Sequence, residues 1–266
     1  QALRHVGLSC GFSITQNDGT LMSADTVRRF PVLTFASGPT NSMRGAAFLT
    51  GIKDAIVVDI GGTTSDVGIL VNGFPRQAST TVDIGGVRTN FRMPDVFAVG
   101  LGGGSLVSPD GSSIGPQSVG YRITSEAMVF GGETLTATDI IVASGKAEIG
   151  DAGATAGVSA NTLQQALHTI QMTLTRAVDR CRTSAEAVPV IAVGGGSILM
   201  PDRLGDLVTM RPENFGVANA VGAAIAQISG EVDRVFSLGR MSWEDAHASA
   251  EAEARAGAVD AGAMAE

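Results

Sequence analysis

Hydrophobic and polar residues alternate along the chain in two patterns that predict two kinds of element. Short apolar runs bounded by turn residues predict buried strands, whereas apolar residues spaced three and four apart predict helices. The predicted strands cover residues 6–14, 30–35, both halves of 57–70, 78–84, 87–92, 96–99, 188–193 and 207–210. The predicted helices cover residues 24–29, 41–49, 139–144, 163–181, 199–204, 217–228 and 243–266. Strands that alternate with helices predict an α/β domain with a mixed sheet flanked by helices.

The clearest predicted helix carries one apolar stripe, which indicates that it packs on a sheet. The stripe consists of Leu163, Ala166, Leu167, Ile170, Leu174, Ala177, Val178 and Cys181. His168 falls off the stripe, so we expect it to be solvated rather than to bind a ligand. Ser23 and Thr138 are expected to cap two shorter helices, because their hydroxyl oxygens can accept from the first helical N–H groups.

One stretch, residues 57–70, combines the strand pattern with residues that carry chemistry. An apolar run leads into Asp59, Gly61, Gly62, Thr63, Thr64 and Asp66, and a second apolar run leads away. This pattern predicts a strand, a tight turn and a second strand. Glycines let an anion approach the backbone N–H groups, the threonines add hydroxyl donors, and Asp59 can order a divalent cation. The alternative is an ordinary hairpin with a Gly-Gly turn.

Two further strands end in glycines, and together the three turns favour a nucleotide site. The three turns come after Asp59, Val99 and Val193. Ligands of open α/β sheets collect beyond strand ends, where backbone N–H groups converge. The expected ligand contacts are Gly61, Gly62, Thr63, Thr64, Gly102, Gly103, Gly194, Gly195, Gly196 and Ser197. Residues 82–86 repeat the start of the first motif without its hydroxyl pair, so Gly85 is expected to form a plain turn.

Composition narrows the partners and the compartment. The 266-residue chain carries a net charge of −8 and no basic cluster, which argues against nucleic acid and anionic membranes as partners. Cys10 and Cys181 share no motif and fit a reducing compartment, so a cytoplasmic protein is expected. The chain begins at Gln1 in mid-pattern, and we therefore interpret it as a piece of a longer protein.

Four segments resemble parts of the ATPase superfamily that contains actin, sugar kinases and heat-shock chaperones. Ile56–Leu70 resembles its second phosphate motif, and Val190–Pro201 resembles its adenosine motif. The small-residue helices at Thr40–Leu49 and Val217–Ala226 resemble its two connecting helices. The order of these segments is that of the superfamily's second half. Small residues on the two helices suit close approach to a partner, so we expect an exposed surface that can dimerise. The alternative is that the helices pack on their own sheet and the chain is a monomer.

The superfamily resemblance implies an actin-like (ribonuclease H-like) ATPase domain over residues 1–240 and a helical tail over 241–266. ATP and Mg²⁺ are the implied cofactors, with Asp59 and Asp66 as catalytic residues and Asp59 also as the metal ligand. The superfamily's first phosphate turn has no counterpart here. The chain is therefore expected to be one half of a two-domain clamp, with the missing N-terminal ATPase domain of the same protein as its partner.

Within the superfamily, the chain resembles the hydantoinase/oxoprolinase A family. The resemblance lies in Thr15–Gly19, Ser37–Pro39, Val58–Val67, Val99–Ser105, Gly115–Ser118 and Thr136–Asp139. The family pattern has a histidine at the position of Phe97, and it has a different sequence in place of residues 121–130. The resemblance implies an ATP-dependent enzyme that opens cyclic amides such as hydantoins or 5-oxoproline, or that carboxylates ketones.

The implied chemistry is phosphorylation of the substrate's carbonyl oxygen, which makes the carbonyl carbon electrophilic. Phosphoryl transfer depends on positioning and charge neutralisation more than on protein nucleophiles, and the sequence offers no Ser-His or Cys-His arrangement. A small-molecule cyclic amide and a B-type subunit are the implied partners. Two alternatives stay open: a non-catalytic actin-like assembly protein, and a small-molecule kinase of the same superfamily.

Overall fold

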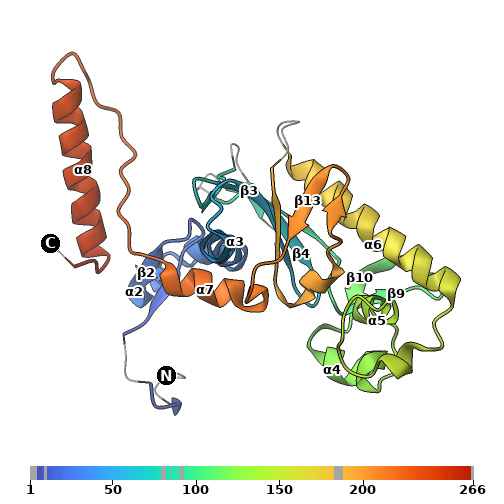
Figure 1. Ribbon diagram of the computed structural model, residues 1–266. Helices are drawn as coiled ribbons and strands as arrows, with labels where there is room; N and C mark the ends of the chain where they lie inside the picture. The colour runs from blue at the N-terminus through green and yellow to red at the C-terminus, as the bar shows by residue number, and fades with distance from the viewer. Residues whose placement is uncertain are drawn as a thin grey trace.

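The structure is a computed structural model that describes residues 5–8, 11–78, 82–84, 86–89, 93–182 and 188–264. Its centre is a mixed sheet in the order β12-β13-β11-β3-β4-β5, with β8 also paired to β4 (Figure 1). The strands are β3 (Ala55–Ile60), β4 (Ser65–Val71), β5 (Phe74–Pro75), β8 (Val96–Val99), β11 (Val190–Val193), β12 (Arg203–Leu204) and β13 (Leu207–Met210). β11 runs parallel to β3 and β13, whereas β3 and β4 are antiparallel. The expected mixed sheet is confirmed.

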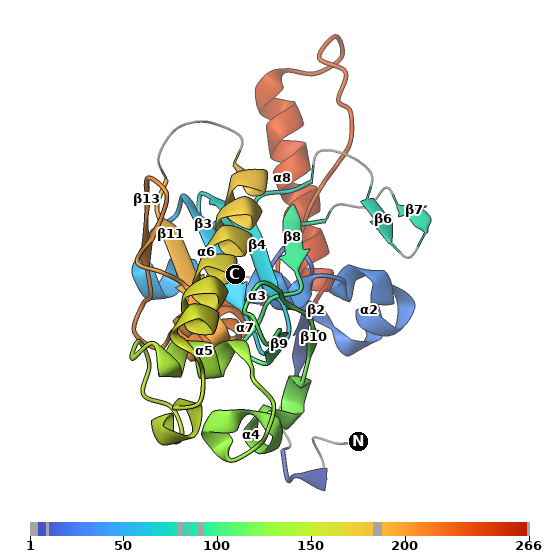
Figure 2. The ribbon, with the colours of Figure 1, turned by 90° about the vertical axis from the view of Figure 1, so that its right-hand side faces the viewer.

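Helices cover both faces of this sheet. Figure 2 shows α6 (Ala160–Cys181) in front of the central strands, with α3 (Ser37–Thr50) and α7 (Ala218–Ile225) behind them. α5 (Ala137–Ala143) lies on the α6 side and contacts α6. The fold thus has the α/β architecture expected of an actin-like ATPase domain.

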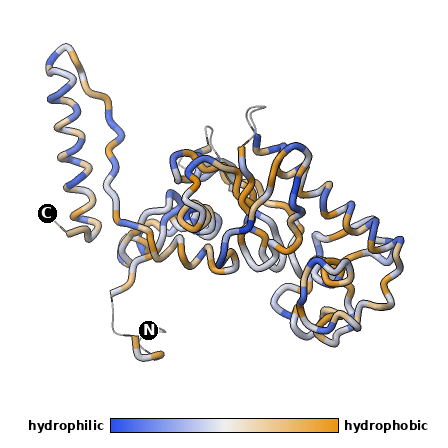
Figure 3. Tube along the Cα trace, in the orientation of Figure 1, coloured by the Kyte–Doolittle hydropathy of each residue, from blue (hydrophilic) through white to orange (hydrophobic). Residues whose placement is uncertain are grey.

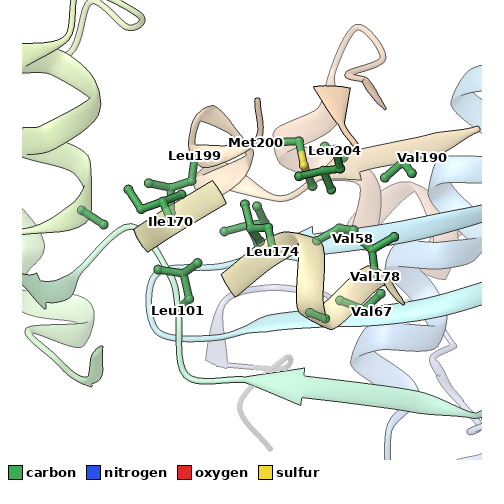
Figure 4. Close-up of a cluster of buried hydrophobic side chains, with 14 of the residues drawn as sticks. Val58, Val67, Leu101, Ile170, Leu174, Val178, Val190, Leu199, Met200 and Leu204 are labelled. Atoms are coloured by element: carbon green, nitrogen blue, oxygen red, sulfur yellow. The ribbon is translucent and has the colours of Figure 1, made fainter. Parts of the chain in front are cut away.

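The central strands are apolar at almost every position because both of their faces are buried. Figure 4 shows Leu174 and Val178 of α6 close to Val58 and Val67 of the sheet. Alternate residues of β3, such as Val57, point into a second cluster against α3 and α7. The predicted apolar stripe of α6 is confirmed as the face that packs on the sheet, and His168 is exposed.

The two small-residue helices pack against each other. A Cβ atom at Gly45 of α3 would lie 1.9 Å from the carbonyl oxygen of Ala218, and one at Gly222 of α7 would lie 1.8 Å from that of Asn41. Only glycine permits this backbone approach. The glycine faces are therefore covered within the chain. Both helices also pack on the sheet, which is the alternative considered from sequence.

The remaining elements lie around this core. They are β1 (Ser13–Thr15), β2 (Leu21–Ser23), α2 (Ala24–Arg29), η1 (Pro31–Thr34), β6 (Val82–Ile84), β7 (Val87–Thr89), β9 (Ser105–Val107), β10 (Ile114–Ser118), η2 (Gly120–Arg122), α4 (Ile123–Glu126), η3 (Met128–Phe130), η4 (Ala152–Thr155), η5 (Gly195–Leu199), η6 (Phe215–Val217) and α8 (Trp243–Asp260). α8 stands apart from the sheet, at the left of Figure 1. Figure 3 shows hydrophilic and hydrophobic residues mixed along α8, which fits the exposed helix predicted for the tail.

Four sequence expectations were wrong. A strand was predicted over residues 6–14. Among the described residues there, strand pairing begins only at Ser13, in β1, and Val6 is exposed. Residues 30–35 include a 3₁₀ helix rather than a strand, because Pro31 has a fixed φ and no N–H. Residues 199–204 do not form a helix, since Pro201 interrupts the segment before β12 begins.

The fourth concerns the cap of α5. Thr136 rather than Thr138 is the capping residue, and its hydroxyl oxygen accepts from the backbone N–H of Asp139. The Asp139 carboxylate accepts from Thr136 in return. This reciprocal capping box requires an acidic or amide side chain three residues after the cap, and Asp139 fills that position.

Within the described residues, no helix combines the length and apolar character needed to span a bilayer.

Candidate functional site

The three glycine turns meet at one end of the sheet. β3 and β11 are parallel neighbours, so the turns that follow them leave the sheet at the same edge. A Cβ atom at Gly196 would lie 2.5 Å from the carbonyl oxygen of Gly61. The turn after Val99 lies against the turn after Asp59, because the Gly103 N–H donates to the Gly61 carbonyl oxygen at 3.0 Å and the Gly104 N–H to that of Gly62 at 2.7 Å. Segments more than 100 residues apart in sequence thus form one cluster.

The hydrogen bonds of the 61–64 turn hold its carbonyl groups inward. Besides the bonds from Gly103 and Gly104, the Gly61 N–H donates to the Thr64 carbonyl oxygen at 2.9 Å. In a trans peptide the N–H points opposite to the C=O of the same unit, so inward carbonyls at Gly61 and Gly62 aim the next two N–H groups outward. Among the described residues, the N–H groups of residues 62–64 have no acceptor, and these residues are exposed. Successive outward N–H groups form an anion-binding concavity.

The glycines of the cluster fall into two groups. A Cβ atom at Gly102 would lie 2.5 Å from the Thr63 backbone nitrogen, and one at Gly194 would lie 2.5 Å from the Ile60 carbonyl oxygen. These positions, like Gly196, need glycine because of packing. In contrast, a Cβ at Gly62 or Gly195 would meet no atom within 4 Å. The fold does not require glycine there, whereas close approach of a ligand to the backbone would.

Some of the residues that the sequence predicted as ligand contacts are buried. Gly102, Gly103, Gly196 and Ser197 are buried behind the exposed turn, and the N–H of Gly103 is already bonded to Gly61. Gly62, Thr63, Thr64 and Gly195 are exposed, and Gly61 and Gly194 are partly exposed. The structure therefore brings all ten predicted contact residues together but leaves only some of them on the surface of the site.

Asp59 and Asp66 face each other across the hairpin as directly paired residues of β3 and β4. Burial raises the pKa of Asp66 to about 6, with a smaller contribution from the neighbouring Asp59 carboxylate. Burial also raises the pKa of Asp59, and a hydrogen bond with the Ser42 side chain opposes this rise. Like-charged carboxylates in a partly desolvated site resist ionisation until a cation arrives. This pair, next to the outward N–H groups, fits a divalent cation bound together with an anion.

Mg²⁺ is the cation that fits this donor set, because it is held by one or two carboxylates together with phosphate oxygens and water. A self-contained metal cage is a different arrangement. Among the described residues, no group of three or more His, Cys, Asp and Glu side chains is placed to hold a metal. Phe97, at the family's histidine position, contributes no ligand, and the centre of its ring lies 4.0 Å from the guanidinium carbon of Arg180 in a cation–π contact.

A cavity of about 520 Å³ adjoins the third glycine turn, and sequence reasoning missed it. It is lined by Asp202, Thr209, Arg211, Pro212, Glu213, Asn214 and Phe215. The Gly194 N–H donates to the Phe215 carbonyl oxygen at 2.9 Å, which ties the cavity to the turn. Close by, the Ser197 hydroxyl is fully buried and has no hydrogen-bond partner among the described residues. The sequence feature that could have indicated this cavity is the run of mostly polar residues at 211–214, between a predicted strand and a predicted helix.

The repeat of the first motif lies away from this cluster. β6 and β7 form a separate two-stranded sheet with Asp83 opposite Arg88. Gly85, the glycine expected to form a plain turn, lies outside the described residues. Nothing therefore tests the expectation that this turn contacts no ligand.

Comparison with known proteins identifies relatives of the chain. A family model described as hydantoinase/oxoprolinase matches residues 1–153. The acetophenone carboxylase gamma subunit of Aromatoleum aromaticum is 31% identical over 150 residues, which are 54% of this chain and 20% of that protein. The acetone carboxylase beta subunit of Xanthobacter autotrophicus is 31% identical over 113 residues, which are 40% of this chain and 16% of that protein. The chain thus spans about a fifth or less of these relatives.

Solved structures show the same fold. An ATP-dependent caprolactamase from Pseudomonas jessenii matches with a TM-score of 0.69 at 19% identity, over 100% of this chain and 44% of that chain. A nucleotide-free structure of acetone carboxylase matches with a TM-score of 0.65 at 19% identity, over 88% of this chain and 38% of that chain. The family model covers more than half of the sequence, and its match agrees with the resemblance carried by the motifs. The chain therefore belongs to the hydantoinase/oxoprolinase family.

Proposed function

We propose that this chain is the ATP-binding half of an ATP-dependent enzyme of the hydantoinase/oxoprolinase family. The observation that carries the proposal is the 61–64 turn. Its Gly61 and Gly62 carbonyls are bonded inward, so that the N–H groups of Gly62 and Thr63 are directed outward, and the N–H groups of residues 62–64 have no acceptor among the described residues. The Thr63 and Thr64 hydroxyls lie on the same exposed turn. Phosphate oxygens are the acceptors that satisfy such a set of donors.

The carboxylate pair complements this anion site. Asp59 and Asp66 would hold Mg²⁺ beside the turn, and the ion would neutralise charge on the phosphates. Asp59 is the residue nearer the third turn, because its Oδ1 atom lies 2.3 Å from the position of a Cβ at Gly194. We assign Asp59 as the main metal ligand and Asp66 as its partner.

The cavity beside Gly194 supports a nucleoside at the other end of the same site. Its 520 Å³ volume is within the usual range for small-molecule sites. The exposed Gly195 lets a ligand approach the backbone closely, and Arg211 offers a cationic planar group for stacking. The phosphates would lie on the 61–64 turn and the nucleoside along residues 194–197, so that one nucleotide spans two turns.

The reaction that we propose is activation of a substrate carbonyl by phosphorylation, followed by opening of a cyclic amide such as a hydantoin or 5-oxoproline. The solved caprolactamase relative acts, by its name, on a cyclic amide with ATP. Ketone carboxylation is the second candidate, because two curated relatives are subunits of acetophenone and acetone carboxylases. In both cases the chain would contribute the domain over residues 1–240 and would work with a further ATPase domain of the same protein and with a B-type subunit.

The test is the affinity of the purified chain for ADP with magnesium, measured by calorimetry. Gly62→Ala places a methyl group in open space in the free protein, so it should fold normally yet lose at least about tenfold in affinity. Gly157→Ala is the matched control, because a Cβ there also meets no atom within 4 Å and Gly157 lies outside the cluster. Equal affinity for the wild type and Gly62→Ala would contradict the proposed phosphate site.

A further inference from the structure

Two segments that carry the family resemblance, Gly115–Ser118 and Thr136–Asp139, lie outside the three glycine turns yet directly behind them. The Ser118 hydroxyl donates to the Gly62 carbonyl oxygen at 3.2 Å. Thr138 donates to the Gly103 carbonyl oxygen twice, from its N–H and from its Oγ1, each at 2.9 Å. The two segments belong to neighbouring elements, because Leu106 of β9 bridges to Thr136 and β9 pairs with β10 (Figure 1).

These contacts form a layered series of hydrogen bonds. Thr138 holds the Gly103 carbonyl, and the Gly103 N–H in turn holds the carbonyl of Gly61. The Gly62 carbonyl oxygen accepts from two donors, the Gly104 N–H and the Ser118 hydroxyl. A carbonyl with two donors uses both of its lone pairs. The best-anchored peptide unit of the turn is therefore the one that joins Gly62 to Thr63.

The orientation of that peptide unit decides whether the turn attracts or repels an anion. Its carbonyl and its N–H point in opposite directions, so a carbonyl fixed inward presents the Thr63 N–H outward. If the unit rotated, the carbonyl oxygen would face the anion instead. Ser118 Oγ is well placed to prevent this rotation, because it also accepts from the Gly120 N–H at 3.0 Å and is thereby held in place itself.

We infer that Ser118 is a positioning residue of the anion site, which acts through the Gly62 carbonyl to keep the Thr63 N–H directed at a bound phosphate. Thr138 has the same role one layer further back, through Gly103. The inference rests on the proposed function for the identity of the ligand, but its geometric content concerns the free protein. It gives the Gly115–Ser118 segment a function that does not require contact with the nucleotide.

The test compares Ser118→Ala with Ser118→Thr, which keeps the hydroxyl, and with Ser118→Cys, which keeps the size but donates weakly. Ser125→Ala is the matched control, because the Ser125 hydroxyl also donates to a backbone carbonyl, that of Arg122, in an exposed segment away from the turn. Two quantities are measured for each variant: the hydrogen-exchange rate of the Gly104 amide, which donates to the Gly62 carbonyl oxygen in the free protein, and the affinity for ADP with magnesium.

Ser118→Ala should speed exchange of the buried Gly104 amide, whose acceptor is the Gly62 carbonyl oxygen, and weaken ADP binding about three- to tenfold, which is the usual value of one hydrogen bond. Ser118→Thr should restore both quantities, Ser118→Cys should fall between, and Ser125→Ala should match the wild type. A purely structural serine would lower the melting temperature in Ser118→Ala without a specific change in exchange at Gly104. If Ser118→Ala fails to fold, the comparison of Ser118→Cys with Ser118→Thr decides the question.

The positioning role of Ser118 and the proposed nucleotide site can fail separately. Wild-type exchange at Gly104 in Ser118→Ala, together with unchanged ADP affinity, would overturn the positioning role and leave the nucleotide site standing. Absence of ADP binding by the wild type would contradict the proposed function, while the exchange rates in the free protein would still decide the role of Ser118.

Discussion

At the scale of single residues, the pair Asp59 and Asp66 gives the site its pH dependence. The pKa of Asp66 is raised to about 6 by burial and by Asp59, compared with 3.8 for an unperturbed aspartate. The folded protein therefore binds this proton more tightly than the unfolded chain does. The resulting stabilisation is fully present below about pH 4 and is lost as the pH rises through about 6.

Asp66→Asn should remove the stabilisation that the folded protein gains from the tightly bound Asp66 proton. The unfolding free energy of the wild type relative to the variant is expected to fall between about pH 4 and pH 6 and to stay level above about pH 7, as measured by urea denaturation. Asp110→Asn is the control, because hydrogen bonds from Ser108 and Ser112 lower the pKa of Asp110 to about 2. The unfolding free energy of the wild type relative to Asp110→Asn should change with pH only below about pH 4. Parallel profiles for the wild type and Asp66→Asn across this range would contradict the buried-pair account.

The sequence predicted the glycines of the site but not their different roles. Gly62 and Gly102 look alike in sequence, each following a strand and a short apolar run. Only Gly102 faces another backbone, because a Cβ atom there would lie 2.5 Å from the Thr63 nitrogen, whereas one at Gly62 would lie in open space. Clearance around a Cβ is a property of neighbours distant in sequence. Local pattern could not reveal it.

At the scale of elements, the close contact of α3 and α7 depends on two glycines. Gly222→Ala would place a methyl group 1.8 Å from the Asn41 carbonyl oxygen. Alanine favours a helix by about 1 kcal/mol relative to glycine, but overpacking costs about 1–3 kcal/mol, so the variant should be less stable. The control is Gly257→Ala in α8, where the nearest atom is 3.9 Å away and stability should not fall. A Gly222→Ala variant as stable as the wild type in denaturation would contradict this close packing.

Elements were predicted well where the apolar period was long or where both sheet faces were buried. The stripe of α6 and the fully buried strand Val190–Val193 appear as expected. Prediction failed in short apolar segments such as residues 6–14 and 30–35, because an apolar run alone does not supply a pairing strand. The parallel pairing of β3 with β11, which brings two turns together, was implied only by the assumption that strands share one sheet edge.

At the scale of the whole molecule, the exposed turn has consequences for turnover. Gly62, Thr63, Thr64 and Gly195 face solvent in this chain, so a bound γ-phosphate would be open to water on one side. Misplacement of reacting groups by about 1 Å can cost on the order of a hundredfold in rate. We expect this chain alone to bind nucleotide but to release little phosphate from ATP with magnesium, whether or not hydantoin or 5-oxoproline is present. Robust substrate-stimulated phosphate release by the 266-residue chain would contradict the half-clamp proposal.

The central claim is that turns more than 100 residues apart in sequence form one nucleotide site. The most direct measurement is an NMR titration of the isotope-labelled chain with ADP and magnesium. The account predicts that amides of residues 62–64 and of residues 194–197 shift together, with one dissociation constant, while amides of α8 stay unchanged. Shifts in only one of the two turns, or in neither at millimolar ADP, would contradict the account.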